Sequence, residues 1–301
     1  MKKSAFIGLS VLAAGAAALS SALLLPKLFL HKALDRPKNA GKEACPPPLS
    51  GLERVELTAR DGTPLVGHLR RSTEPKRFII AMHGWRSSWY KDFGAVADFW
   101  HENGCDVLYA EQRGQGESGG DVMTYGILER YDCADWVAWA AERCGGEQPI
   151  YIAGVSMGAT TVLMAAGLPE VQAKVRGVMA DCGFTSPEAI WRHVSENRYH
   201  IPYGFWKKRI ERLSAARLNG APGAYSTVDA MQTTALPVLL VHGLDDRFVP
   251  PSMTRANYEA CAAPIKRLLL VPGARHAMSY LVARDEYEQT VLDFWSELET
   301  E

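Results

Sequence analysis

The segment 154–158 reads Gly-Val-Ser-Met-Gly and places one serine between two glycines. The apolar, β-branched stretch 149–153 before it predicts a buried parallel strand, and the small apolar stretch 159–166 after it predicts a buried helix. A serine on such a strand-to-helix turn is a nucleophile elbow, which lifts the hydroxyl above the edge of the sheet. The flanking glycines are needed because a Cβ there would collide with neighbouring backbone. Ser156 is therefore the candidate nucleophile.

A serine hydroxyl needs a base to take its proton and an acid to orient that base. In hydrolases built on this turn, the order along the chain is serine, acid, histidine. Stretches 237–241 and 266–271 read as buried strands, and the loops after them carry Asp246 and His276 respectively. Open α/β sheets bind ligands at the carboxyl ends of their strands, where both residues are expected. Of eight histidines, only His276 follows Asp246, so it is the predicted general base.

Three carboxylates compete for the role of the acid. Asp245 and Asp246 are adjacent, so their side chains should point in different directions and only one can reach the ring of His276. Asp181 follows the predicted strand 175–180 and is a third candidate. The residues that lose this role are expected to be solvated loop acids or backbone caps.

Acyl transfer also needs two backbone N–H groups that stabilise the oxyanion. One is expected from Met157, the residue after the nucleophile. The other is expected from Trp85, in the loop that follows the predicted strand 78–82, where Gly84 permits the turn. The alternative is a plain glycine turn. His83, in the same loop, is expected to brace the loop rather than to react.

These motifs resemble those of the serine α/β-hydrolases. More narrowly, the chain resembles bacterial membrane-anchored or cell-surface hydrolases related to prolyl-oligopeptidase and serine-aminopeptidase-like domains. The resemblance covers about residues 53–298 and implies Asp246 as the acid, because the pattern His-Gly-x-x-Asp-x-x-Val-Pro begins at His242. It depends on the segments 83–85, 113–118, 154–158, 242–250 and 273–276.

Two positions depart from the family pattern. Position 115 is Gln where the family usually has His, and Glu111 stands where an Asp is usual. Neither belongs to the proposed catalytic residues, so the departures put only the bracing of this loop in question.

The resemblance implies an α/β-hydrolase fold: a mostly parallel eight-stranded sheet, helices on both faces and a small helical cap. The sequence predicts an opening hairpin from 55–60 and 65–70. An insertion at about 184–235 is too long for a bare connection and is expected to form the cap. The predicted helices cover about 90–103, 124–143, 158–168, 252–262 and 284–298. The aromatic and histidine side chains of the insertion that could line a substrate pocket are Trp191, His193, Tyr199, His200, Tyr203, Phe205 and Trp206.

The first residues form a segment of their own. After Lys2 and Lys3, residues 5–25 are free of charge and long enough to cross a hydrocarbon core of roughly 30 Å. We assign 1–36 to an uncleaved signal anchor, with a cleaved signal peptide as the alternative, and 37–50 to a Pro-rich linker before the hydrolase domain 51–301. The resemblance favours an extracytoplasmic catalytic domain. The lysines and arginine within residues 27–42 favour the opposite orientation, because positively charged residues next to a membrane segment tend to stay on the cytoplasmic side.

Composition sets further limits. A chain of 301 residues with 47 % hydrophobic residues suits one large α/β domain, and a net charge of −1 gives no reason to expect a nucleic-acid partner. The six cysteines are scattered without metal-ligand spacing, so we expect no metal and no cofactor.

The predicted function is a serine hydrolase that cleaves a carboxylic ester or related small acyl substrate through an acyl-enzyme. Two alternatives stay open: a serine peptidase or aminopeptidase-like enzyme, and a membrane-anchored binding protein without catalysis.

Overall fold

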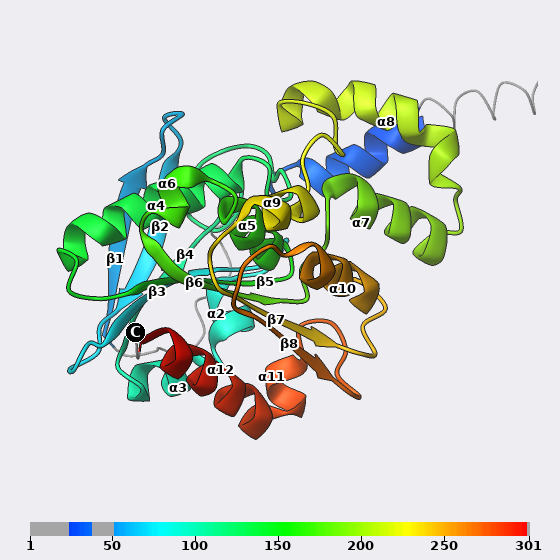
Figure 1. Ribbon diagram of the computed structural model, residues 1–301. Helices are drawn as coiled ribbons and strands as arrows, with labels where there is room; N and C mark the ends of the chain where they lie inside the picture. The colour runs from blue at the N-terminus through cyan, green and yellow to red at the C-terminus, as the bar shows by residue number, and fades with distance from the viewer. Residues whose placement is uncertain (1–23, 38–50, 300–301) are drawn as a thin grey trace, which may run out of the picture.

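A computed structural model describes residues 24–37 and 51–299. Its centre is a twisted eight-stranded sheet with the order β1-β2-β4-β3-β5-β6-β7-β8 (Figure 1). Only the pairs β1–β2 and β2–β4 are antiparallel, and the other neighbours are parallel. The strands are β1 (Leu52–Thr58), β2 (Pro64–Arg70), β3 (Arg77–Met82), β4 (Cys105–Ala110), β5 (Ile150–Val155), β6 (Val175–Asp181), β7 (Val238–Gly243) and β8 (Lys266–Val271).

Strands β3, β4 and β7 are buried along their whole length, and each contains a continuous apolar run. Two clusters of apolar side chains cover the two faces of the sheet. The first cluster takes side chains from α4 (Glu129–Cys144), α5 (Met157–Ala165) and α9 (Thr227–Thr233). The second takes them from α2 (Trp89–Phe93), α3 (Ala97–Glu102) and α12 (Arg284–Glu299). The remaining helices outside the cap are α6 (Pro169–Gln172), α10 (Pro251–Ala260) and α11 (Ser279–Val282).

The predicted mostly parallel eight-stranded sheet is confirmed, as is the opening hairpin. The stretch 90–103 differs from its prediction, because it contains two short helices, α2 and α3, rather than one. The helix predicted at 124–143 begins only at Glu129, whose buried carboxylate accepts hydrogen bonds from the backbone of Thr124 (2.6 Å) and Gly126 (2.9 Å). The preceding residues therefore form a turn held by that side chain.

The first part of the insertion after β6 forms the expected helical cap, whereas its last helix, α9, packs on the sheet. The cap consists of α7 (Pro187–His193), a π-helical turn η1 (Val194–Arg198) and α8 (Tyr203–Leu218). A third apolar cluster holds the cap to the rest of the molecule, and it includes Trp191, Tyr203 and Met157.

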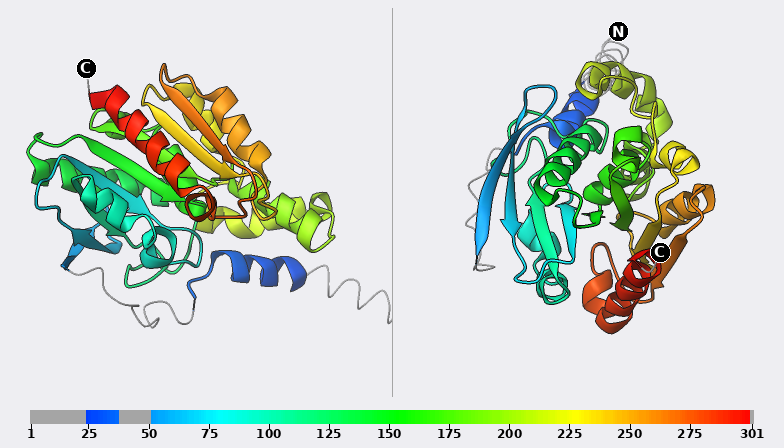
Figure 2. Two further views of the ribbon diagram at one scale, coloured as in Figure 1. Left: turned by 90° about the horizontal axis from the view of Figure 1, so that it is seen from below. Right: turned by 60° about the vertical axis from the view of Figure 1, so that its left-hand side comes forward.

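Residues 24–34 form a helix that lies beside α7 and α8 and packs into the third apolar cluster through Leu30, Ala33 and Leu34 (Figure 2). The sequence assigned this stretch to a separate N-terminal segment, yet its apolar face is buried on the hydrolase domain. The backbone after it is tied down as well, because Leu34 accepts a hydrogen bond from the N–H of Met123 (2.7 Å). Residues 5–23 of the predicted anchor and residues 38–50 of the predicted linker at 37–50 lie outside the described residues. Within the part of the chain that the structure describes, no helix is long and apolar enough to cross a membrane.

The approach of α5 to the sheet explains the glycines of the elbow. A Cβ on Gly158 would lie 1.7 Å from the carbonyl oxygen of Met82, and one on Gly154 would lie 2.2 Å from that of Gly158. Both contacts involve backbone atoms, which cannot move away through a change of side-chain rotamer. Gly158 is therefore required by the packing of α5 against β3, and Gly154 by the tight turn between β5 and α5, as the sequence predicted.

We expect Gly158→Ala to destabilise the fold severely or to prevent soluble expression, because the added methyl group overlaps backbone. Thermal unfolding of the purified variant measures this effect. Gly204→Ala is the matched control, since a Cβ there meets nothing within 4 Å and Gly204 lies in α8. That change should leave stability unchanged or raise it by up to about 1 kcal/mol. Equal stability of both variants would contradict the packing described here.

Candidate active site

Ser156 lies on the turn between β5 and α5 with a positive φ of 57° and a ψ of −115°. Non-glycine residues rarely adopt this region, so the turn is strained. Its N–H donates to the carbonyl of Asp181 at the end of β6 (2.8 Å), which fixes the turn to the sheet. The side chain thereby lies at the carboxyl edge of the parallel strands, at the N-terminal end of α5.

The structure brings three of the predicted residues together in one hydrogen-bonded line. His276 Nε2 lies 2.9 Å from Ser156 Oγ, and His276 Nδ1 lies 2.6 Å from Asp246 Oδ2. The serine follows β5, the acid follows β7 and the histidine follows β8, so three strand ends converge on one point. Phe248 packs edge-on against the imidazole, with ring centroids 5.0 Å apart, and limits its rotation.

Asp246 is the most constrained of these side chains. Its Oδ1 accepts hydrogen bonds from the N–H groups of Phe248 (2.8 Å) and Val249 (2.9 Å), and its Oδ2 lies 3.2 Å from His242 Nε2. Burial by itself raises the pKa of this carboxyl. The hydrogen bonds from His242, His276 and the backbone outweigh burial and hold its pKa well below the ordinary value. The carboxylate therefore stays ionised beside His276.

The structure separates the three carboxylates that the sequence proposed as the acid. Asp245 is exposed, and Asp246 alone of the three hydrogen-bonds to His276. Asp181 is buried and accepts a hydrogen bond from Ser279 Oγ (3.0 Å). Burial raises the pKa of Asp181, which favours its neutral form and makes it a poor partner for a cation.

Sequence reasoning missed the part that His242 plays in this arrangement. His242 is fully buried, its Nδ1 lies 2.6 Å from Thr254 Oγ1 and its Nε2 lies 2.9 Å from the carbonyl of Val249. Because the carbonyl of Val249 can only accept, Nε2 of His242 is the donor in this contact. Its side chain supports the acid rather than the substrate. The only signal in the sequence was its position four residues before Asp246.

The loop expected to stabilise an oxyanion lies directly beside Ser156. A Cβ on Gly84 would lie 3.3 Å from the Cβ of Ser156, so this glycine permits the close approach. Asp92 holds the loop in place, accepting from the N–H of Gly84 (2.6 Å) and from Ser87 Oγ (2.7 Å). Trp85 follows Gly84 in this loop, and Met157 occupies the first turn of α5, where helix N–H groups have no partner within the helix.

His83 braces this loop, as the sequence predicted. Its Nδ1 lies 2.9 Å from the carbonyl of Gly84, and its Nε2 accepts from the N–H of Gln112 (3.2 Å). The two departures from the family pattern also contact this region: Gln115 Oε1 accepts from the N–H of Arg86 (2.5 Å), and the carboxylate of Glu111 accepts from the N–H of Glu117. Gln and Glu thus fill the bracing positions.

An apolar cavity of about 160 Å³ opens onto Ser156. The cap contributes Trp191 and Tyr199, two of the aromatic residues that the sequence proposed for the pocket. The other cap residues proposed for it do not line this cavity. The remaining lining side chains are Phe29, Lys32, Ala33, Trp85, Tyr125, Phe184, Ile190, Val194, Arg198 and Phe248.

The helix at 24–34 forms one wall of this cavity through Phe29 and Ala33, which the sequence did not predict. It is tied to the loop beside Ser156, because Trp85 Nε1 donates to the carbonyl of Ala33 (2.8 Å). The guanidinium of Arg86 donates to the carbonyl of Lys32 (2.9 Å). No sequence pattern revealed this role, since Phe29 is one apolar residue among many in that stretch.

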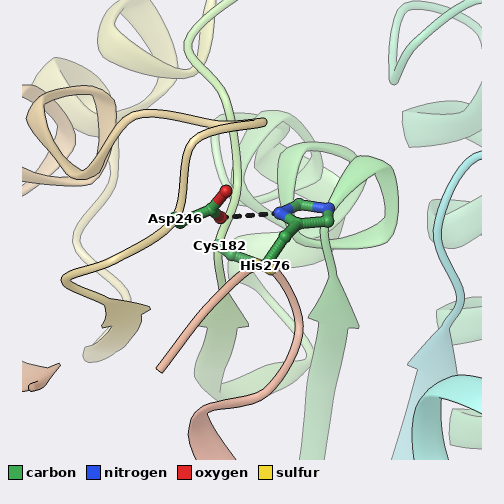
Figure 3. A group of neighbouring side chains, drawn as sticks. All are labelled: Cys182, Asp246 and His276. Atoms are coloured by element: carbon green, nitrogen blue, oxygen red, sulfur yellow. Dashed lines mark hydrogen bonds and ion pairs between the residues drawn. The ribbon is translucent and has the colours of Figure 1, made fainter. Parts of the chain in front are cut away.

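Cys182 lies beside Asp246 and His276 (Figure 3), and the three ligand atoms lie within 4.8 Å of one another. Burial raises the pKa of this thiol well above its ordinary value, so the sulfur stays protonated. Because His276 Nδ1 already hydrogen-bonds to Asp246, the group suits a hydrogen-bonding network better than a metal site.

Comparison with known proteins gives three kinds of match. A profile of the alpha/beta hydrolase fold matches residues 78–227. The YqkD protein of Bacillus subtilis is 31% identical over 193 residues, 64% of this chain and 62% of YqkD, so the match spans less than two thirds of that relative. The YfhR protein of Escherichia coli strain K12 is 25% identical over 250 residues, 80% of each protein. The esterase Pf2001 of Pyrococcus furiosus superimposes with a TM-score of 0.69 at 21% identity, over 88% of this chain and 97% of the esterase.

These matches confirm the predicted α/β-hydrolase fold. The narrower resemblance to the prolyl-oligopeptidase and serine-aminopeptidase-like group stays a prediction.

The lowered pKa of Asp246 predicts a pH effect on stability. A carboxyl whose pKa is depressed by folding stabilises the protein above its unfolded pKa, about 4, and this stabilisation is lost as the pH falls below it. Asp246→Asn should therefore lower the free energy of unfolding at pH 7 and flatten its decline below about pH 5. Urea unfolding at a series of pH values measures this. Asp245→Asn, at the exposed neighbour, is the control. If both variants keep the same acid dependence as the parent chain, Asp246 is not held as described.

Proposed function

From its α/β-hydrolase fold, we propose that the chain is a serine hydrolase that cleaves a carboxylic ester through an acyl-enzyme. The observation that carries the proposal is the hydrogen-bonded line Ser156–His276–Asp246, whose serine opens into an apolar cavity. The esterase among the structural matches agrees with this reading, although at its low identity it supports the fold alone.

The geometry supports the following course of reaction. Ser156 Oγ attacks the acyl carbon while His276 Nε2 takes its proton, and Asp246 stabilises the imidazolium through Nδ1–H. The N–H groups of Met157 and Trp85 are the proposed donors to the oxyanion. His276 then gives the proton to the departing alkoxide oxygen, which leaves an acyl group on Ser156. A water molecule, deprotonated by the same ring, releases the acid and restores the serine.

The lining of the cavity favours an ester over the substrate of an aminopeptidase. An aminopeptidase must bind the free ammonium group of its substrate, which requires carboxylates or other acceptors. The described residues that line the cavity include no Asp or Glu, and their charged members are the cations Lys32 and Arg198. An apolar acyl group suits such a surface.

A binding protein without catalysis is the less favoured alternative. A strained serine turn lowers stability, and a protein that only binds does not require such a turn.

We further propose that the charge-free residues 5–25 attach the chain to a membrane. The extracytoplasmic location of the domain stays a prediction from the sequence.

A fluorophosphonate probe tests the proposed nucleophile. We expect it to label the parent chain, to fail on Ser156→Ala and to react far more slowly with His276→Ala, because each change removes part of one cooperative unit. Undiminished labelling of Ser156→Ala would identify another nucleophile.

Asp246→Asn should lower kcat for a p-nitrophenyl ester by on the order of 10⁴, because it favours the wrong tautomer of His276. Asp245→Asn and Asp181→Asn are the matched controls and should cost far less.

The cavity predicts a limit on acyl-chain length. With p-nitrophenyl esters, kcat/KM should rise over the first few carbons of the acyl chain and then fall once the cavity is full. Each buried methylene should lower the activation free energy by roughly 0.8 kcal/mol. Phe29→Ala and Trp191→Ala should each move the optimum to longer chains, because both rings bound the cavity.

Trp206→Ala is the control for this series, since Trp206 lines a neighbouring groove rather than the cavity. The sequence had proposed Trp206 for the pocket itself. A flat chain-length profile, or a preference for aminoacyl amides over all esters, would overturn the ester proposal.

A further inference from the structure

Three large apolar side chains are exposed on two neighbouring helices. Leu24, Leu28 and Phe205 are 56%, 59% and 77% exposed. Leu24 and Leu28 share a face of the N-terminal helix, being four residues apart. Phe205 lies in the first turn of α8, a helix that runs beside the N-terminal helix (Figure 1). A group of exposed apolar residues marks an interaction surface, whereas single scattered apolar residues do not.

A groove joins this patch to the interior. It runs between the N-terminal helix and the cap and is lined by Leu25, Phe29, Tyr199 and Trp206. Phe205 packs edge-on against Trp206, with ring centroids 4.8 Å apart, so the exposed patch is continuous with the groove. Phe29 and Tyr199 also line the cavity at Ser156. These two side chains are therefore the partition between the groove and the candidate active site.

The surroundings of the patch indicate what covers it. Lys27 and Lys32 on the N-terminal helix and Lys208 on α8 are exposed beside the apolar side chains. Lys208 follows Phe205 by three residues, so the two share a face of α8. Directly before Leu24, residues 5–23 are apolar and without charge. Apolar residues flanked by lysines are typical of a surface that lies on lipid headgroups.

We propose that this face, defined by Leu24, Leu25, Leu28, Tyr199 and Phe205, rests on the surface of a lipid bilayer. The groove then opens toward the acyl chains, and an ester dissolved in the bilayer enters the cavity past Phe29 and Tyr199. The part of the proposal that concerns the substrate rests on the proposed hydrolase function, whereas the part that concerns docking does not.

Fluorescence quenching in the full-length chain tests the docking. A bimane label is attached at Phe205→Cys, or at Leu281→Cys as the matched control. Leu281 is 61% exposed but lies on α11, on the other side of the sheet from α8. The unsubstituted chain, treated with the same reagent, gives the background from its own cysteines. Each sample is reconstituted into phosphatidylglycerol vesicles that contain lipids with a nitroxide at a shallow acyl position.

We expect the nitroxide lipid to quench the label at position 205 at least about twofold more than the label at 281, because interfacial side chains lie roughly 5–10 Å into the headgroup boundary. Quenching of the two labels by aqueous iodide should show the reverse order. If position 205 is shielded from iodide but not quenched by the lipid, a second copy or another segment of this chain covers the patch and the proposal is wrong. Free access of iodide to position 205 would also overturn it.

A second experiment tests the entry of the substrate. Leu28→Glu and Phe205→Glu should lower the rate of hydrolysis of p-nitrophenyl octanoate held in vesicles by about tenfold or more. A charged carboxylate at either position makes insertion into the lipid interface unfavourable. Both should leave hydrolysis of p-nitrophenyl acetate in solution unchanged, and Leu281→Glu should change neither. An equal loss with Leu281→Glu, or no loss with the first two, would contradict lipid entry. If the parent chain hydrolyses neither ester, the hydrolase proposal fails while the quenching result stands.

Discussion

The rest of the site depends on the contact between the start of α5 and the end of β3. Gly158 lies so close to the carbonyl of Met82 that no side chain fits, and this approach bends the chain sharply at Ser156. The strained conformation is held by the packing of α5 in the core and by the hydrogen bond from Ser156 N–H to Asp181. Burial of apolar surface elsewhere thus maintains a local geometry that the isolated peptide would not adopt. The backbone of Ser156 is thereby fixed where its hydroxyl lies 2.9 Å from His276 Nε2.

Asp246 is the second fixed point. Its carboxylate is buried, which is unfavourable for a charge, but it accepts hydrogen bonds from two backbone N–H groups and two imidazoles. A buried charge with this many donors keeps its ionised form and has few alternative orientations. The hydrogen bond between Asp246 and Nδ1 in turn orients the ring of His276. His242 completes the arrangement because its own ring is oriented by Thr254 and by the carbonyl of Val249.

The walls of the cavity come from outside the sheet. The cap and the N-terminal helix supply aromatic and aliphatic side chains, whereas the strand ends supply the reactive groups. Part of the wall is therefore separate from the reactive groups, whereas Trp85 and Phe248 belong to the loops that follow β3 and β7. The link between the two parts is the loop after β3. Its Trp85 donates to the carbonyl of Ala33 on the N-terminal helix, and its Gly84 contacts Ser156.

The sequence alone predicted the fold class, the tight turn at Ser156 and the order of the candidate serine, acid and histidine along the chain. These features depend on local rules: apolar strand runs, glycines where a Cβ does not fit, and polar residues just after strand ends. It could not separate Asp246 from Asp181 by residue type, because that choice depends on which buried carboxylate the ring of His276 meets in space. Nor could it find Phe29, Asp92 or the bracing role of His242. Their partners lie in other elements, and only the packed structure decides which apolar residue of a helix becomes the wall of a cavity.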